Sequence, residues 1–362
     1  MRNFPDAPAK TVISLCPLSN PANRFVDMFS QALSEQGYIV QDFRWNSLLR
    51  AKTSFIFVHW PDEFFTRTDS LRGVRSLIKL LVLHVAKMLW GTKFVWVAHN
   101  AMPHDSDNVN SLSKRGFLRS LDGVVFLSEH SRKLIQDLYP AIRPCDSLVT
   151  VHPHYRSSSI SHETPCANVI GDIKLLHFGQ IRPYKNVETL VDVVSSVPFG
   201  VHLSVAGMIA NETLCETIKS KVQRLSHITL DLRDVPIEEA ELEMIVDSSD
   251  AVVLPYKNIL NSAAALFSLS RNRPILAPNT GSLPELQETV GRDWVYLYDN
   301  EFSVEVLREF REWMLTTKRA KTAPMDAYNL RRIGEDLRGL IEAMKGKGRR
   351  WIVSAPGPVS AP

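Results

Sequence analysis

A glycine, an arginine and a lysine follow the apolar run in the segment "LLHFGQIRPYKNVETLVDVV", which extends from Leu175 to Val194. Gly179 permits a tight backbone turn, and Arg182 and Lys185 precede a stretch with helical periodicity. Cations and the N-terminal amides of a helix both favour an anion, so this segment predicts a phosphate site. The alternative is that both cations are solvated loop residues.

A second loop rich in small residues lies between Leu254 and Leu286, after the apolar run "AVVLPY" and before a predicted helix. A third loop, "NTGSLPE", follows the next apolar run and ends in Glu285, which could instead serve as a helix cap. The residues that we expect to bind one ligand in this half are Gly179, Gln180, Arg182, Lys185, Tyr256, Asn261, Ser262, Ala263 and Glu285.

Polar residues also follow apolar strands in the first half, in "HWPDE" and "AHNAMPHD". A polar residue at this position suits a binding site better than a packed core. A structural hydrogen bond is the alternative for each of them. The residues concerned include His59, Asp62, His99 and His104.

Alternating strands and helices must position these residues. Short apolar runs such as "TVISLC", "SFIFVHW" and "KFVWVAHN" are separated by helical stretches, which is typical of parallel sheets covered on both faces. The pattern predicts an α/β fold with two Rossmann-like domains facing a central cleft. We expect domains at residues 1–158 and 172–345, a linker rich in Ser, Thr and Pro at 159–171, and a flexible tail at 346–362.

Composition is that of an ordinary globular protein. The 362 residues are more than one typical core accommodates, and 44% are hydrophobic and 22% charged. A net charge of +3 does not indicate a nucleic-acid partner. The four cysteines show no metal-ligand spacing and no disulfide framework, which fits a reducing cytosol. The start of the chain resembles no signal peptide, and no apolar run is long enough to span a membrane.

The segment from Leu71 to Lys93 combines a wide apolar arc with recurring cations. Such a basic amphipathic helix could lie in an anionic membrane interface, with Trp90 at its boundary. It could equally be a core helix of the first domain with a solvated basic stripe. The cations are Arg72, Arg75, Lys79 and Lys87.

The second half resembles the nucleotide-sugar domain of GT-B glycosyltransferases of the broad family 4 superfamily. The resemblance rests on the Gly-x-x-x-Pro-x-Lys spacing from Gly179 to Lys185, on the "LPY" strand end and on "RPILAPNTGSLPEL". In the first half, "NPANRFVDMFSQAL", "VHWPDEF" and "VAHNAMPHD" resemble bacterial exopolysaccharide enzymes, the xanthan-type GDP-mannose-dependent β-mannosyltransferases. Lys185 matches the phosphate-binding lysine, whereas Gln180 replaces the usual arginine and Arg182 lies nearby.

Ile259 and Phe267 stand where retaining members of this superfamily carry two glutamates. The resemblance therefore implies an inverting enzyme that moves mannose from GDP-mannose to a lipid-diphosphate-linked oligosaccharide at the cytoplasmic face of the membrane. It implies no cofactor and no metal, because cations and helix N-termini can stabilise the leaving diphosphate. The alternatives are a retaining transferase with another donor, and a non-catalytic protein that binds nucleotide sugars or polysaccharides.

An inverting transfer needs a general base in the first domain. Asp62 is the first candidate, because Trp60 and Phe64 beside it could raise the pKa of its carboxyl group. His99 is the second candidate. The residues expected to bind the acceptor are Asn23, His59, Trp60, Asn100 and His104.

Overall fold

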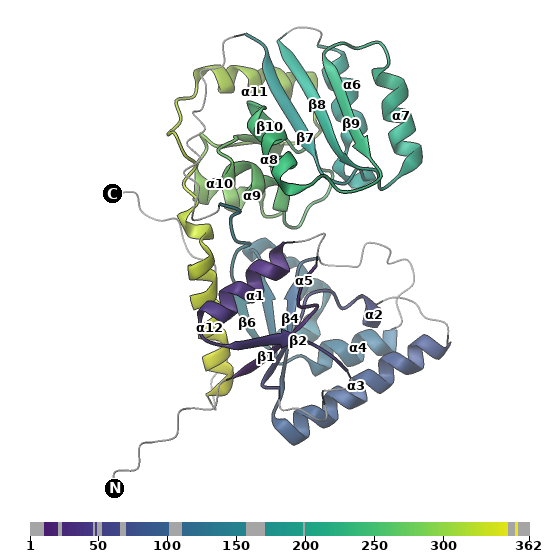
Figure 1. The fold of residues 1–362 in the computed structure, drawn as a ribbon, viewed down its shortest axis with the longest axis vertical. Helices are drawn as coiled ribbons and strands as arrows, with labels where there is room; N and C mark the ends of the chain where they lie inside the picture. Colours follow the sequence, from purple (N-terminus) through teal and green to yellow (C-terminus); the bar gives the residue numbers. More distant parts are fainter. Residues whose placement is uncertain are drawn as a thin grey trace. The chain divides into compact units, whose positions relative to one another are not determined.

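The computed structural model describes residues 11–20, 24–45, 48, 53–65, 70–100, 111–156, 171–197, 200–346 and 352–353. The chain forms two compact α/β units (Figure 1). The first unit runs to Pro153 and resumes at Tyr328, and the second extends from His154 to Ala327. Two parallel sheets with flanking helices confirm the predicted fold class.

The first unit contains a parallel sheet with the strand order β13-β6-β5-β4-β3-β1-β2. Its strands are β1 (Val12–Cys16), β2 (Ile39–Asp42), β3 (Phe55–Val58), β4 (Lys93–Ala98), β5 (Gly123–Phe126), β6 (Asp146–Val149) and β13 (Ile352–Val353). Its helices are α1 (Phe25–Glu35), α2 (Asp62–Phe65), α3 (Ser70–Trp90), α4 (Ser111–Ser120), α5 (Glu129–Leu138), the short 3-10 helix η1 (Pro140–Ile142) and α12 (Leu330–Lys345).

Helix α12 belongs to the first unit, although the sequence placed it in the second domain at 172–345. Its apolar stripe joins the core formed by α1 and the first sheet. Gly334 permits the close packing of α12 on α1, because an added Cβ there would lie 2.8 Å from the carbonyl oxygen of Ala32. The core residues of α12 are Ile333, Leu337, Leu340, Ile341 and Met344.

A short strand lies within the segment 346–362, which was predicted to be a flexible tail. Strand β13 pairs in parallel with β6, so that Ile352 lies opposite Ser147 and Val353 opposite Leu148. The predicted linker falls almost entirely outside the described residues, and the first unit ends at Pro153, before the expected boundary at 158. Strand β13 was not predicted, because two apolar residues are too few to show the alternation typical of a strand.

The second unit contains a parallel sheet with the strand order β12-β11-β10-β7-β8-β9. Its strands are β7 (Ile173–Phe178), β8 (Val201–Met208), β9 (Ile228–Arg233), β10 (Ala251–Val253), β11 (Ile275–Pro278) and β12 (Val295–Tyr298). Its helices are η2 (Pro183–Lys185), α6 (Val187–Ser195), α7 (Glu212–Val222), α8 (Glu239–Asp247), α9 (Ala263–Ser270), α10 (Leu283–Val290) and α11 (Val304–Thr316), followed by η3 (Asp326–Tyr328) at the junction of the units.

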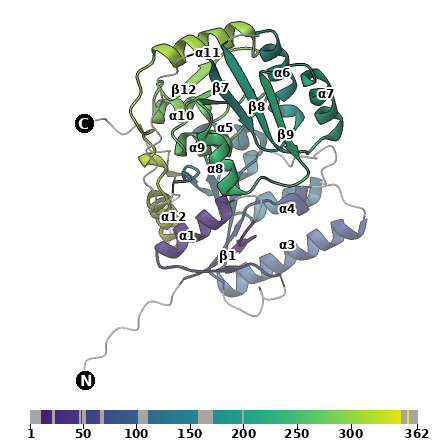
Figure 2. The ribbon, with the colours of Figure 1, turned by 45° about the horizontal axis from the view of Figure 1, so that its top comes forward.

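Helices α6, α7 and α11 share one apolar core with this sheet (Figures 1 and 2). Strand β10 (AVV) is buried at all three positions and β7 (IKLLHF) at five of six, as expected for central strands covered on both faces, whereas β8 exposes His202 and Ser204. Side-chain caps begin several of the helices, since Asn211 caps α7, Ser262 caps α9 and Ser303 caps α11. Each cap fixes where a loop ends at the edge of the sheet.

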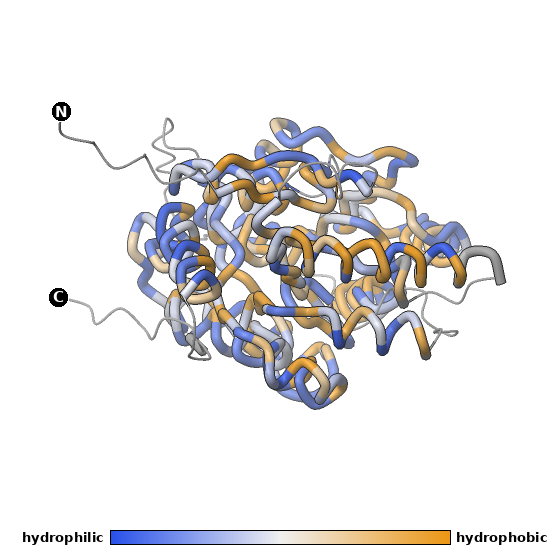
Figure 3. The backbone as a smooth tube through the Cα atoms, turned by 90° about the horizontal axis from the view of Figure 1, so that it is seen from below, coloured by the Kyte–Doolittle hydropathy of each residue, from blue (hydrophilic) through white to orange (hydrophobic). Residues whose placement is uncertain are grey.

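Helix α3 exposes apolar side chains along much of its length. Figure 3 shows the mixture of apolar and polar residues in this part of the chain. No helix in the described ranges is both long and apolar enough to cross a membrane. The exposed apolar residues of α3 are Val74, Leu77, Ile78, Leu81, Met88, Leu89 and Trp90.

We expect Gly334→Ala to lower the free energy of unfolding by about 1–2 kcal/mol. Its Cβ would force the backbones of α12 and α1 apart, and the resulting strain would exceed the roughly 1 kcal/mol that alanine gains in a helix. Gly346→Ala is the control, because its Cβ would meet only ordinary contacts at 3.6 Å. Denaturant titration measures both variants. Equal or greater stability of Gly334→Ala would contradict the close packing of α12.

Candidate functional site

The sheet of the second unit has its topological switch point between β7 and β10. From β7 the chain continues to β8 and β9 on one side, whereas β10, β11 and β12 lie on the other. Ligands of open α/β sheets bind at the carboxyl ends of the strands at such a point. The predicted loops after Phe178 and Val253 both begin there.

Gly179 shapes the first of these loops. Its φ of +105° favours glycine, and an added Cβ would lie 2.6 Å from Nζ of Lys185. Its carbonyl group packs so closely on Gly207 of β8 that any side chain at 207 would collide with it. Both glycines are therefore required to bring the ammonium group of Lys185 against the backbone at the end of β7.

Lys185 is a buried cation without a carboxylate partner in the part of the chain that the structure describes. Its side chain is 9% exposed, and Nζ lies 3.5 Å from the carbonyl oxygen of Phe178. Desolvation, and then the nearby charge of Arg182, lower the pKa of Lys185 to about 8. Burying a charge is costly unless a partner compensates it, so this arrangement is suited to an anionic ligand.

Arg182 and Gln180 complete this cradle. Nε of Arg182 donates a hydrogen bond of 2.9 Å to Oε1 of Gln180. No described carboxylate pairs with Arg182, so the guanidinium group can also meet an anion. The role of Arg182 beside Lys185 stays a prediction, and the structure adds that Gln180 orients the guanidinium group.

His177 lies beside Lys185 and was not predicted. Its Nδ1 donates a hydrogen bond of 2.9 Å to the carbonyl oxygen of Val253, which joins β7 to β10. Burial, and then the charge of Lys185, lower the pKa of His177 to about 3. The imidazole is therefore neutral, and its buried Nε2 has no hydrogen-bond partner among the described residues. Because His177 lies inside an apolar strand, a search for polar residues that follow strands does not find it.

The loop after β10 brings Tyr256 and Ser262 to the same edge. The ring centroid of Tyr256 lies 6.0 Å from Nζ of Lys185, and its hydroxyl group is hydrogen-bonded to Ser262. Oγ of Ser262 also accepts a hydrogen bond of 3.2 Å from the backbone amide of Ala265. Asn261 is half-buried before this cap, and Ala263 is exposed as the first residue of α9. Glu285 is half-buried in the first turn of α10.

Phe267 is part of the apolar packing of α9, which explains why no acidic group acts there. Its ring lies 5.8 Å from Phe178 and 5.3 Å from Tyr155. The backbone of Ile259 packs on Gly281, whose φ is +63° and whose added Cβ would clash with the carbonyl oxygen of Ile259. These two positions therefore support the loops and offer no side-chain hydrogen bond to a ligand.

Three histidines gather at the carboxyl edge of the first sheet. Nδ1 of His59 lies 2.9 Å from Nε2 of His99, and the ring of Phe25 packs on both His99 and His152 at 4.6 Å and 4.8 Å. Trp60 stacks on His99 at 5.0 Å. His99 keeps part of its surface exposed, whereas His59 is 1% exposed. His152 was missed, although it follows the apolar run of β6 as His59 follows β3.

All three imidazoles are neutral. Desolvation lowers the pKa of His59 to about 3 and that of His152 to about 4. Burial, followed by the charges of His59 and His152, holds the pKa of His99 well below its usual value. A neutral imidazole has one nitrogen that donates a proton and one that accepts a proton. His99 is partly exposed and is therefore the histidine that a ligand could reach.

Asp62 does not have the apolar setting that was predicted for it. It is exposed at the first residue of α2 and is not enclosed by Trp60 and Phe64. Asn100 directly follows His99 and is half-buried, whereas Asn23 and His104 lie outside the described residues. The structure thus brings His59, Trp60 and His99 together.

Comparison with known proteins identifies close relatives by sequence. The chain is 31% identical over 313 residues to a GDP-mannose:glycolipid 4-beta-D-mannosyltransferase from Xanthomonas campestris pv. campestris, and the match covers 84% of each chain. A second protein of the same name from this organism is 30% identical over 315 residues, again covering 84% of each chain. No protein-family model matches the chain.

Solved structures share the fold. The crystal structure of Anabaena HepE in complex with UDP and glucose matches with a TM-score of 0.57 at 13% identity, covering 93% of this chain and 98% of HepE. The lipopolysaccharide outer core galactosyltransferase WaaB in its apo form matches with a TM-score of 0.61 at 10% identity, covering 92% and 99%. Both are glycosyltransferase-type folds with two α/β units, as found here.

The buried ammonium group of Lys185 predicts a pH dependence of anion binding. Lys185 is protonated below its pKa of about 8, so affinity for inorganic pyrophosphate should fall as pH rises through that value. Lys185→Arg keeps its charge at every accessible pH and serves as the control that corrects for titration of the probe. Isothermal titration calorimetry between pH 6.5 and 9.5 measures both proteins. Parallel pH profiles would remove Lys185 from the anion site.

Proposed function

The chain belongs to the glycosyltransferase family of the GDP-mannose:glycolipid 4-β-D-mannosyltransferases, and we propose that it transfers mannose from GDP-mannose to a lipid-linked oligosaccharide with inversion at the sugar. The observation that carries this proposal is the buried Lys185, which lacks a carboxylate partner in the described structure and lies at the switch point beside Gly179. The product would serve exopolysaccharide assembly.

The proposed reaction is a single displacement. A hydroxyl oxygen of the acceptor attacks C1 of mannose, the bond from C1 to the β-phosphate oxygen breaks, and GDP leaves with the electron pair. Lys185 and Arg182 neutralise the charge that develops on the diphosphate, without a metal ion or another cofactor. Ile259 and Phe267 support an inverting course, because neither can act as a side-chain acid or nucleophile.

We assign removal of the acceptor proton to His99. It is neutral, it is partly exposed, and His59 holds its ring through the 2.9 Å contact between Nδ1 and Nε2. A positioned imidazole that accepts a proton in the transition state contributes about 10²- to 10⁴-fold to a rate. Asp62, whose carboxyl group is exposed, remains the alternative base.

The test of this function is release of GDP from GDP-mannose in the presence of a lipid-linked acceptor, with the anomeric form of the product read by proton NMR. We expect a β-mannoside, and thermal shifts with GDP and GDP-mannose but not with UDP or ADP. An α-mannoside would indicate a retaining enzyme. Nucleotide binding without turnover with any acceptor would support the non-catalytic alternative.

We expect His99→Gln to lower turnover by about 100-fold or more and to leave GDP affinity unchanged. The reason is that the imidazole would act on the acceptor, whereas the nucleotide cradle lies in the second unit. Asp62→Asn is the matched control and should retain most of the turnover. The reverse pattern, with activity lost only in Asp62→Asn, would return the role of base to Asp62.

We further propose that α3 binds the anionic surface of the cytoplasmic leaflet, which carries such an acceptor. Leu112 of the adjacent helix α4 is also exposed, at 64%. Arg75, Arg115 and Arg119 are exposed and have no carboxylate partner among the described residues. Lys87 was also expected among the cations that contact headgroups, but its ammonium group forms an ion pair with Asp122 at 2.7 Å. Apolar side chains and cations on neighbouring helices are complementary to an anionic interface.

A double variant with Leu81→Asp and Met88→Asp should reduce binding to phosphatidylglycerol vesicles by at least roughly 10-fold, since each exposed apolar side chain contributes to burial in the interface. Met244→Asp is the control, because Met244 is 66% exposed in α8 of the second unit. Vesicle sedimentation measures all three proteins. Equal binding of the double variant, or binding to neutral phosphatidylcholine alone, would contradict the assignment.

A further inference from the structure

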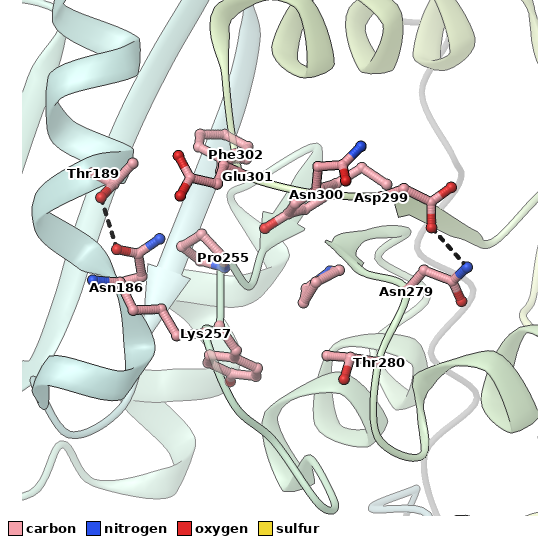
Figure 4. Close-up of a pocket in the computed structure, with 13 residues that line it drawn as sticks. Asn186, Thr189, Pro255, Lys257, Asn279, Thr280, Asp299, Asn300, Glu301 and Phe302 are labelled. Atoms are coloured by element: carbon pink, nitrogen blue, oxygen red, sulfur yellow. Dashed lines mark hydrogen bonds between the residues drawn. The ribbon is translucent and has the colours of Figure 1, made fainter.

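A second pocket opens at the carboxyl edge of the second sheet, with a volume of about 530 Å³. It lies beyond the ends of β10, β11 and β12 and at the start of α6 (Figure 4). Its size is within the usual range for small-molecule sites. The residues that line it include Asn186, Thr189, Tyr256, Asn279, Tyr298 and Phe302.

Amide and hydroxyl groups face each other across this pocket. In Figure 4, Asn186 and Thr189 lie on one side and Asn279 and Thr280 on the other. Oγ1 of Thr189 donates a 2.7 Å hydrogen bond to Oδ1 of Asn186, and Nδ2 of Asn279 donates a 2.9 Å hydrogen bond to Asp299. These bonds fix the orientation of the two amides and leave further donors and acceptors for a ligand.

Tyr298 provides the observation that points to a ligand. It lines the pocket and is 6% exposed, and its ring packs on Phe302 at 5.6 Å. Tyr298 therefore brings a hydroxyl group to the wall of the pocket. Burial raises the pKa of this hydroxyl, so it stays protonated and can donate. A donor at the wall of a pocket can bond to a hydroxyl group of a ligand.

The charges of the pocket differ from those of the Lys185 cradle. Asp299 and Glu301 contribute two carboxylates, and Lys257 is the one cation that lines it. Such a surface does not favour a diphosphate. Tyr256 borders both regions, because it lines the pocket and its ring lies 6.0 Å from Nζ of Lys185. The pocket therefore adjoins the anion site but is suited to another chemistry.

We infer that this pocket is a binding site for a neutral saccharide that is separate from the nucleotide sugar. Amides and carboxylates are the groups that bind sugar hydroxyls, and the Tyr298 and Phe302 rings offer an apolar surface to the C–H face of a sugar. The occupant is a neutral oligosaccharide, such as part of a glycan chain. The inference does not depend on transfer activity, because binding to the site needs no donor.

Isothermal titration calorimetry with β-1,4-mannobiose and with cellobiose tests the site directly, first without nucleotide and then with saturating GDP. We expect binding in the millimolar range, with the same affinity when GDP is bound. Absence of binding by both disaccharides would overturn the inference. Displacement by GDP would also overturn it, since the sugar would then occupy the donor site.

Tyr298→Phe separates a binding role from a structural one. Removing only the hydroxyl group should weaken disaccharide binding by roughly 3- to 10-fold and leave thermal stability nearly unchanged, because the ring and its packing on Phe302 are kept. Asn279→Ala should weaken binding as well. Asn258→Ala is the matched control, since Asn258 is exposed beside Lys257 and does not line the pocket. Unchanged affinity in both Tyr298→Phe and Asn279→Ala would refute the site.

Discussion

The burial of the Lys185 ammonium group is the constraint on which the second unit depends. A cation with 9% exposure and no described carboxylate beside it must be supported by backbone dipoles until a ligand arrives. That need accounts for the positive φ of Gly179, for the absence of a side chain at Gly207 and for the neutral state of His177. A larger residue or a second positive charge at any of these places would expel the ammonium group.

Much of this arrangement follows from local pattern. The apolar run before Gly179, the proline after it and the helical period from Val187 place Lys185 at a strand end without knowledge of the fold. The same rule located His59 and His99, and applied to "SLVTVHPHY" it would have found His152. Local pattern cannot predict which distant segments of the chain come together. The sequence around Leu337 does not show that the apolar side of α12 packs on α1. The sequence around Tyr298 does not show that Asn186 lines the same pocket.

The ionisable groups at the carboxyl edges of the two sheets differ in their charge state. In the second unit, the ammonium group of Lys185 is buried without a carboxylate partner among the described residues, so a ligand anion stabilises the fold as it binds. In the first unit, burial keeps the histidines in their neutral form, and the rings of Phe25 and Trp60 pack on His99. The anion site of the second unit thus holds a buried charge, whereas the histidines of the first unit stay neutral across the physiological pH range.

The return of the chain to the first unit sets an order of assembly during synthesis. Residues 154–327 form the second unit as one continuous stretch, which can fold as soon as it leaves the ribosome. The first unit emerges earlier but lacks α12, so Phe29 and Leu33 of α1 lack the core contributed by Ile333 and Leu337 until α12 has been synthesised. The nascent N-terminal unit therefore exposes an apolar face, and a chain truncated before Leu330 would keep that face exposed.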